Sequence, residues 1–283
     1  LHVHSHYSLL DGLTRIEEIV ATAKEFGQPA VALTDHGVMY GAIEFYQAAK
    51  KAGVKPIIGL EAYVAPRNRG DREKQADERA YSHIILLAKN FTGYKNLLQL
   101  TTKAHLEGFY YKPRIDWEIL NQHGDGLIVL TACMGGEIPR LLLAGRDAEA
   151  EALVQRYHKR FGEDFYIELQ RRNNIPELAQ LNVKLLAFAR KYKVSIVATN
   201  DVHYLKTEDA EAHDVVLCLQ TKAKQTDTDR MSMLGENYSF RSSADMALIF
   251  EDLPEAIDNT VAIAEKCNVE LELGKIKLPK FPL

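Results

Sequence analysis

The amino-acid sequence predicts an α/β fold in which parallel strands, covered by helices, form a closed or nearly closed barrel. Short β-branched segments alternate with amphipathic segments through the first two hundred residues. This order of strand and helix is typical of parallel sheets, and its repetition in one chain favours a barrel over an open sheet. A hydrophobic fraction of 46% over 283 residues supplies enough apolar surface for a large core.

The expected strands and helices follow one another with short connections. Strands are predicted at 30–33, 55–63, 82–88, 126–131, 165–169 and 195–199, and helices at 15–26, 41–52, 93–104, 137–144, 148–161, 176–192 and 243–267. The first two helices should stop at Gly27 and Gly53, because glycine readily adopts the left-handed conformation that often ends a helix. These elements predict one domain over residues 1–272.

Three segments lie outside this alternation. Residues 66–80 are highly charged and poor in apolar side chains, which predicts a solvated loop. Residues 221–239 are polar and irregular. Residues 273–283 contain Pro279 and Pro282 and cannot form a regular helix, so we expect the start of a linker. Because the first residue is not Met and the last ten suggest extended chain, we expect a segment of a longer protein.

Composition excludes several classes of protein. A formal net charge of −4 argues against a chain that coats nucleic acid by charge alone, although bound metal ions would add positive charge locally. No apolar run approaches the roughly 20 residues of a membrane-spanning helix, and no basic-then-apolar leader opens the chain. Three widely spaced cysteines do not form a disulfide framework, so a reducing cytoplasm is the expected location.

Side chains that bind metals fall near the ends of the predicted strands. They are His2, His4, Asp11, His36, Glu61, His83, Cys133, Asp201 and His203. His2 and His4 lie two residues apart, as do Asp201 and His203, so each pair can project from one face of an extended chain. Strand carboxyl ends meet on one face of a parallel barrel, where such folds place their chemistry. His83 is the exception, because it begins its strand.

The number and type of donors predict the expected cofactors. Nine donors exceed the four that a tetrahedral zinc ion uses, so we expect two or three divalent ions. Glu61 is suited to bridge two of them. Mixed nitrogen, oxygen and sulfur donors favour Zn²⁺, Mn²⁺ or Fe²⁺ over Mg²⁺ or Ca²⁺.

Each donor taken alone has an ordinary structural explanation. Asp35 and His36 could form a turn, and Cys133 alone would most often be a small buried hydrophobe. Glu61 is a stronger candidate, because a carboxylate in an apolar strand needs a partner. Asp35 is interpreted as an orienting group. The histidines without donor neighbours, interpreted as solvated or packing residues, are His105, His123, His158 and His213. The donors occur together at strand ends, which favours a metal site over these separate explanations.

Four stretches of the sequence resemble the motifs of the PHP (polymerase and histidinol phosphatase) superfamily. They are HVHSHYSLLDG at 2–12, LTDHG at 33–37, GLEAYV at 59–64 with SHIILLAKN at 82–90, and ATNDVHYL at 198–205. Further segments, such as TACMGGEIP and the closing LPKFP, are similar to the PHP domains of bacterial replicative polymerase alpha subunits. The resemblance covers essentially the whole chain.

This resemblance implies a distorted (β/α)7 TIM-like barrel with a C-terminal helical extension. It also implies three groups of ligands: His2, His4, Glu61 and Asp201 for a first ion; Glu61, His83 and Cys133 for a second; and Asp11, His36 and His203 for a third. Asp201, Glu61 and His203 are expected to serve catalysis.

The implied activity is metal-dependent phosphoester hydrolysis, specifically 3′–5′ exonuclease proofreading at a DNA 3′ end. The rest of the alpha subunit is an expected partner, as is a separate proofreading exonuclease. Two alternatives remain: a metal-stabilised scaffold without activity, and a free-standing phosphatase of the histidinol-phosphate type. Retention of all nine donors favours activity over a scaffold. The insert 66–80 and the extension 221–283 argue against a free-standing phosphatase.

Overall fold

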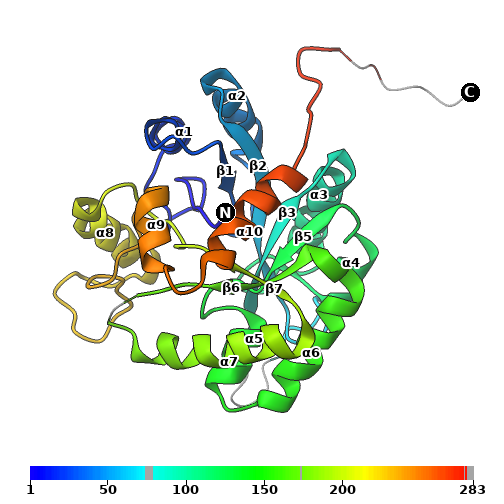
Figure 1. The fold of residues 1–283 in the computed structure, drawn as a ribbon, viewed down its shortest axis with the longest axis vertical. Coiled ribbons are helices and arrows are strands. Elements are labelled where there is room, and N and C mark those ends of the chain that lie inside the picture. Colours follow the sequence, from blue (N-terminus) through cyan, green and yellow to red (C-terminus); the bar gives the residue numbers. More distant parts are fainter. Residues whose placement is uncertain (74–78, 173, 277, 279–283) are drawn as a thin grey trace, which may run out of the picture.

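In the computed structural model, the chain forms one curled sheet covered by helices, so the predicted α/β class is confirmed (Figure 1). The structure describes residues 1–283 except 74–78, 173, 277 and 279–283. The strands are β1 (Ala30–Leu33), β2 (Lys55–Val64), β3 (Ser82–Ala88), β4 (Arg114–Ile115), β5 (Leu127–Leu130), β6 (Phe165–Leu169) and β7 (Ser195–Ala198). The α-helices are α1 (Ile16–Glu25), α2 (Ala42–Ala52), α3 (Phe91–Leu106), α4 (Trp117–Gln122), α5 (Glu137–Leu143), α6 (Asp147–Phe161), α7 (Pro176–Tyr192), α8 (Ala210–Thr221), α9 (Ser243–Ile249) and α10 (Pro254–Lys266).

The strands pair in the order β1-β2-β3-β5-β6-β7, and β4 pairs with β2. The prediction that all strands are parallel is wrong for β3, which runs antiparallel to both β2 and β5. The described part of the segment between β2 and β3 contains no helix. A parallel connection normally requires a crossover, usually a helix, whereas a loop alone can reverse the chain.

The N-terminal residues join the two edge strands, β1 and β7, which share no ladder in the described chain. Val3 forms an isolated parallel bridge with Val202, just past β7. The Val3 carbonyl also accepts a hydrogen bond from the Thr34 backbone, just past β1, at 2.9 Å. The backbone of residues 2–4 is thereby fixed at the seam of the barrel, and both flanking histidines are fixed with it.

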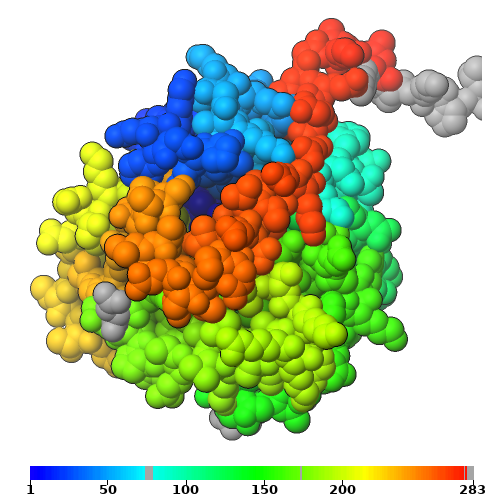
Figure 2. Space-filling view, viewed as in Figure 1, coloured from blue at the N-terminus to red at the C-terminus, as the bar shows by residue number. Residues whose placement is uncertain are grey.

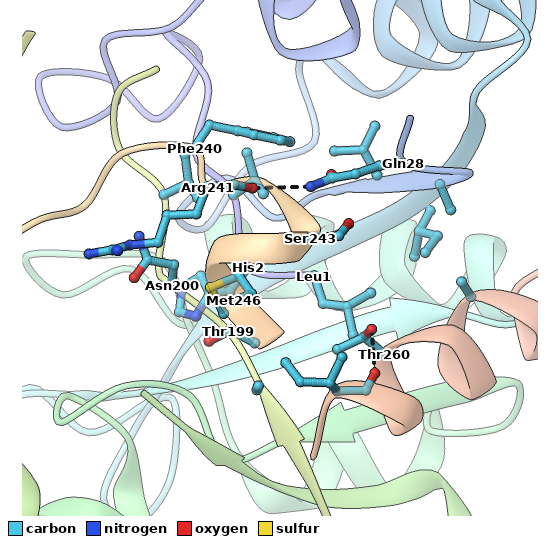
Figure 3. Close-up of a pocket in the computed structure, with 18 of the residues that line it drawn as sticks. Leu1, His2, Gln28, Thr199, Asn200, Phe240, Arg241, Ser243, Met246 and Thr260 are labelled. Carbon is cyan, nitrogen blue, oxygen red and sulfur yellow. Dashed lines mark hydrogen bonds between the residues drawn. The ribbon is translucent and has the colours of Figure 1, made fainter. Parts of the chain in front are cut away.

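An apolar cavity of about 180 Å³ lies along this seam (Figure 3). Leu1, Phe240 and Met246 line it, together with Thr260 of α10. In the space-filling view, the dark blue N-terminal residues are visible at the base of a hollow beside α9 and α10 (Figure 2). Most of the lining is apolar, so we regard this cavity as a packing gap in the barrel wall.

Successive strand residues face two different cores. Ile58, Leu60, Ile84 and Leu86 belong to an outer core between the sheet and the helices. The inner core fills the barrel and contains Ala32, Ile57, Ile85, Leu87, Ile128, Leu130, Tyr166 and Val197, together with Ile263 and Cys267 at the end of α10. Both cores follow from the two-residue period of strand side chains and the covering of both faces of the sheet.

Most predicted elements agree with the observed ones to within two residues at each end. The predicted helix 243–267 is wrong as a single element, because α9 ends at Ile249 and α10 begins at Pro254. Proline cannot donate a helical hydrogen bond but suits the first turn, so it starts a new helix there. The predicted loop 66–80 contains no helix or strand in its described part, and residues 74–78 lie outside that part.

No helix in the described ranges is both long and apolar enough to cross a bilayer. The predicted boundary between a domain at 1–272 and a linker at 273–283 stays a prediction. The last described helix ends at Lys266, and much of the proposed linker lies outside the described residues.

Candidate metal centre

Toward one end of the barrel, the inward-facing side chains change from apolar to polar. On β2, Ile57 belongs to the inner core and Glu61 lies four residues further along the same face. Past β7, Asp201 follows Val197 with the same spacing. Glu61 also pairs in register with Ile85 of β3, which is an inner-core residue. The two-residue period therefore places the donors directly above the apolar interior.

The first group of donors is fully buried and compact. His2 Nε2 lies 3.0 Å from Glu61 Oε2 and 3.1 Å from Asp201 Oδ1. His4 Nε2 lies 3.1 Å and 3.3 Å from the same two oxygens. One ligand atom from each of these four residues falls within 4.8 Å of all the others. Two imidazoles and two carboxylates at this spacing could hold a divalent ion.

The predicted third group, Asp11, His36 and His203, is centred on Asp11, in the loop before Gly12. Asp11 Oδ2 lies 3.0 Å from His36 Nε2, and Asp11 Oδ1 lies 3.0 Å from His203 Nε2. The ring of His4 lies between these histidines, with its centroid 4.4 Å from each of theirs. His4, His36 and His203 also provide one nitrogen each within 4.8 Å of one another. The structure thus brings the predicted third group beside the first.

His83 joins the cluster although it begins its strand. Its Nδ1 lies 2.9 Å from Glu61 Oε1, while His36 Nδ1 lies 3.1 Å from Glu61 Oε2. The antiparallel direction of β3 explains this position, because the amino end of an antiparallel strand lies beside the carboxyl ends of its neighbours. Glu61 therefore contacts donors of more than one group, as a bridging carboxylate would.

Cys133 lies beside the cluster but outside the three compact groups of described donors. Its sulfur accepts a hydrogen bond from the Gly135 backbone at 3.4 Å. A Cβ placed at Gly135 would lie 2.9 Å from His83 Nδ1 and 3.5 Å from Cys133 Sγ, so the two side chains flank this glycine. Burial, with the negative charges of Asp201 and Glu61, raises the pKa of the thiol. The role of Cys133 as a ligand stays a prediction.

Electrostatics in the cluster couple the imidazoles to the carboxylates. Burial alone would raise the pKa of Glu61, but the charges of His36, His2 and His83 lower it well below the usual range. Burial would lower the pKa of His4, yet the adjacent carboxylates of Asp201 and Glu61 raise it to about 10. The protein alone therefore balances its buried carboxylates with protons on histidines. Bound cations would replace those protons.

Several buried donor atoms form no hydrogen bond of suitable geometry with a described residue, although atoms of opposite charge lie close to them. They are His4 Nε2, His36 Nδ1, His83 Nδ1 and Glu61 Oε1. Buried polar atoms are nearly always paired, because leaving one unpaired costs about 1–3 kcal/mol. Each of these atoms faces the centre of the donor cluster, so coordination to a cation would satisfy them. The residues present therefore fit divalent metal ions.

Sequence reasoning missed Glu168, a buried carboxylate on β6. Its Oε1 lies 2.7 Å from His2 Nδ1, and it also accepts hydrogen bonds from Thr199 and Gln170. A carboxylate that holds the far nitrogen of a ligand histidine fixes the ring and its tautomer. The available signal was the same as for Glu61, namely an acidic residue within an apolar strand.

Other polar residues hold the backbone around the donors. Asp35 accepts hydrogen bonds from the Ser5 amide at 2.6 Å and the Ser5 hydroxyl at 2.9 Å, which matches its predicted orienting role. His213 is buried, and its Nε2 lies 2.7 Å from the Asp11 carbonyl oxygen. Asp201 has a φ of 51°, a left-handed conformation that costs free energy in a residue with a side chain. The surrounding contacts therefore maintain a strained backbone at one of the donors.

Known proteins share sequence similarity with this chain across its length. A family model described as the PHP domain matches residues 1–172. The DNA polymerase III subunit alpha of Borreliella burgdorferi is 48% identical over 268 residues, which is 95% of this chain and 23% of that protein. The subunits of Treponema pallidum and Thermus aquaticus are each 45% identical, across all of this chain and 24% of theirs. The chain thus spans about a quarter of these relatives.

Among solved structures, an amidohydrolase from Chromobacterium violaceum has a TM-score of 0.43 at 15% identity, over 71% of this chain and 86% of that one. A putative metal-dependent phosphoesterase from Bifidobacterium adolescentis has a TM-score of 0.35 at 15% identity, over 87% and 94%. Both likenesses are too distant to indicate an activity. With a family model matching more than half of its length, the chain belongs to the PHP domain family.

Proposed function

We propose that this chain is the PHP domain of a bacterial DNA polymerase III alpha subunit and that its metal centre is a 3′–5′ exonuclease. Similarity along nearly all of this chain to about a quarter of the subunits of that name supports the first part. The grouping of donors around Glu61 supports the second, because it suits adjacent ions. Residues 1–272 would form the domain, and 273–283 would lead toward the polymerase core.

The proposed ligands follow the predicted groups. His2, His4, Asp11, His36, Glu61, His83, Cys133, Asp201 and His203 would hold two or three Zn²⁺, Mn²⁺ or Fe²⁺ ions. Such ions bind phosphate oxygens, lower the pKa of a bound water and stabilise the leaving alkoxide. The protein itself would contribute by fixing the orientation and protonation of the ligand side chains.

Two histidines are presented in a defined tautomer. The Nδ1 atom of His203 lies 2.9 Å from the Asp201 carbonyl oxygen, which can only accept, so Nδ1 carries the proton and Nε2 is left as a donor to metal. Likewise, Glu168 accepts from Nδ1 of His2 and leaves its Nε2 toward Asp201. Together with Glu61 and Asp201, these groups would keep the site ready for phosphate without rearrangement.

The experiment is hydrolysis of a 3′-labelled single-stranded DNA by the protein loaded with Zn²⁺, Mn²⁺ or Fe²⁺. We expect stepwise release of mononucleotides, no release in chelator, and weaker support by Mg²⁺. DNA blocked at its 3′ end should remain intact. Intact unblocked DNA with every metal would contradict the exonuclease. The metal-stabilised scaffold, docking a separate exonuclease, would then be the better proposal. Turnover of histidinol phosphate instead would favour the free-standing phosphatase.

A further inference from the structure

A groove of about 880 Å³ opens beside the metal centre, between α5, α6 and the start of β3. Gly135 and Ser82 lie in its wall. Gly135 is the residue flanked by the side chains of His83 and Cys133. Tyr81, also in the wall, stacks its ring on His83 at a centroid distance of 5.9 Å. The groove therefore leads directly to one edge of the donor cluster.

Positive charge dominates the groove. Its wall includes four arginines, Arg79, Arg140, Arg146 and Arg156, against two carboxylates, Glu137 and Glu149. Glu149 is paired with Arg146 at 2.6 Å. Glu137 accepts a hydrogen bond from Tyr157 at 3.0 Å, and burial raises its pKa, so its negative charge is disfavoured. The net charge of the wall is opposite in sign to that of the whole chain.

Arg140 is the residue that most clearly indicates a ligand. It is half-buried, and its guanidinium donates to the Tyr81 carbonyl rather than to a carboxylate. Burial and the charge of nearby Arg79 lower the pKa of Arg140, and the smaller opposing effects of Cys133 and Tyr81 do not offset them. Within the described ranges, no carboxylate forms an ion pair with either guanidinium. Two cationic groups held together without a paired carboxylate are unfavourable, and an anion between them would remove this cost.

The burial of the donors restricts which anion reaches them. His2, His4 and Glu61 are each at most 1% exposed. A paired duplex end is too wide to place its terminal phosphodiester among buried groups, whereas a single strand is narrow and flexible. A groove with several guanidiniums that ends at such a site suits a chain of regularly spaced phosphates.

We propose that this arginine groove binds the phosphodiester backbone of the single DNA strand whose 3′ end enters the metal centre. This proposal rests on the proposed exonuclease function and concerns how the protein binds the DNA strand that is cleaved. Arg79 and Arg140 contact the phosphates nearest His83. Arg156, whose guanidinium lies 3.9 Å from the Trp117 ring centroid, is fixed further along the groove.

The test uses metal-loaded protein and a fluorescent single-stranded oligonucleotide with phosphorothioate linkages at its 3′ end, which keep the charge but slow hydrolysis. Fluorescence anisotropy would compare the wild type with Arg79→Ala/Arg140→Met. We expect binding at least about tenfold weaker, because two charge-assisted contacts are lost. The slope of log K against log salt should become shallower by about 1.4, roughly 0.7 for each lost contact.

The matched control is Lys51→Ala/Arg190→Ala, which removes the same charge from two exposed helical positions outside the groove. It should bind as the wild type does. The single variant Arg140→Lys keeps a positive charge at this position, so it should retain most of the affinity of the wild type. If Arg140→Met lowers the melting temperature, Arg79→Ala alone carries the test, since Arg79 is exposed.

Failure of the two proposals can be distinguished. If the wild type degrades labelled DNA but the groove variant binds as tightly as the control, the groove is wrong and the exonuclease stands. If the wild type leaves DNA intact but binds it through these arginines, the exonuclease is wrong and the groove stands. Absence of binding by the wild type, or equal competition by polyglutamate, would overturn the groove.

Discussion

The barrel interior contains two layers built from the same strands, and they obey opposite physical rules. In the inner core, Ile57, Ile85 and Leu87 are buried apolar side chains, and their burial stabilises the fold directly. Two or four residues further along the same strands, Glu61 and Glu168 are equally buried, and burying them costs free energy unless opposite charges compensate. We call the apolar residues the lower layer and the metal-binding donors the upper layer. The lower layer should tolerate the loss of metal, whereas the upper layer should depend on it.

The largest effect is expected from Asp201→Asn in the upper layer. The amide keeps the shape of the side chain but removes the anionic charge that would hold an ion. Hydrolysis of 3′-labelled DNA should fall on the order of 10²–10³-fold or more while circular dichroism stays unchanged. Asp258→Asn, at an exposed position on α10, is the matched control. Equal cleavage by Asp201→Asn and the wild type would remove Asp201 from the proposed site.

Metal removal should destabilise the upper layer, which would lower the melting temperature and make it depend on pH. Saturation at a hundredfold excess over Kd is worth about 2.7 kcal/mol, so chelation should lower the melting temperature by several degrees. In the metal-free protein, the raised pKa of His4 contributes stability below pH 6.5, which is lost as pH rises toward about 10. The lowered pKa of Glu61 contributes stability above its ordinary 4.5, which is lost on acidification.

The metal-free protein should therefore melt highest between about pH 4.5 and 6.5. Because bound ions displace protons from histidines, the increase in melting temperature caused by metal should grow from pH 6 to pH 9. Thermal denaturation with and without chelator across this range checks both expectations. An increase that shrinks with rising pH would contradict the proposed histidine ligands.

Glu168→Gln should give an intermediate effect, because Glu168 contacts His2 on the side away from the other donors. The amide can present its NH₂ group where the carboxylate accepted, which disturbs the His2 tautomer. Metal affinity, measured by competition with a chelating dye, should fall about 10–100-fold. The shape of the melting curve in excess metal should be retained. A metal affinity equal to that of the wild type would show that Glu168 does not orient His2 for metal binding.

The smallest effect is expected from Ile85→Val in the apolar layer. Losing one buried methyl group should cost about 0.5–1.5 kcal/mol of unfolding free energy. The decrease should be the same with metal and with chelator, because Ile85 belongs to the inner core. A loss seen only in the metal-loaded protein would show that the two layers are energetically coupled.

The sequence predicted most of the fold, because strand and helix periods are local properties. β3 and β6 match their predicted bounds in full. Strand direction is not local, so the antiparallel course of β3 was missed, and with it the reason that His83 lies among the donors. The single helix predicted at 243–267 overlooks Pro254, a residue that suits the first turn of a helix and begins α10.

Prediction of the candidate site had a similar limit. Donors in recognisable motifs, such as His2 and Asp201, lie together as expected. Glu168 has no motif around it, and its importance depends on reaching across the barrel to His2. The arginine groove is even less visible in sequence, because Arg79 and Arg140 come from segments far apart in the chain. Their adjacency is a property of the folded structure alone.

Because residues 2–4 close the seam against Val202, barrel closure and assembly of the metal centre are one event. His2 and His4 lie roughly two hundred residues before Asp201 and His203 in the sequence. The centre therefore depends on contacts of long sequence separation, which are slow to form because so much chain must be ordered to close the loop.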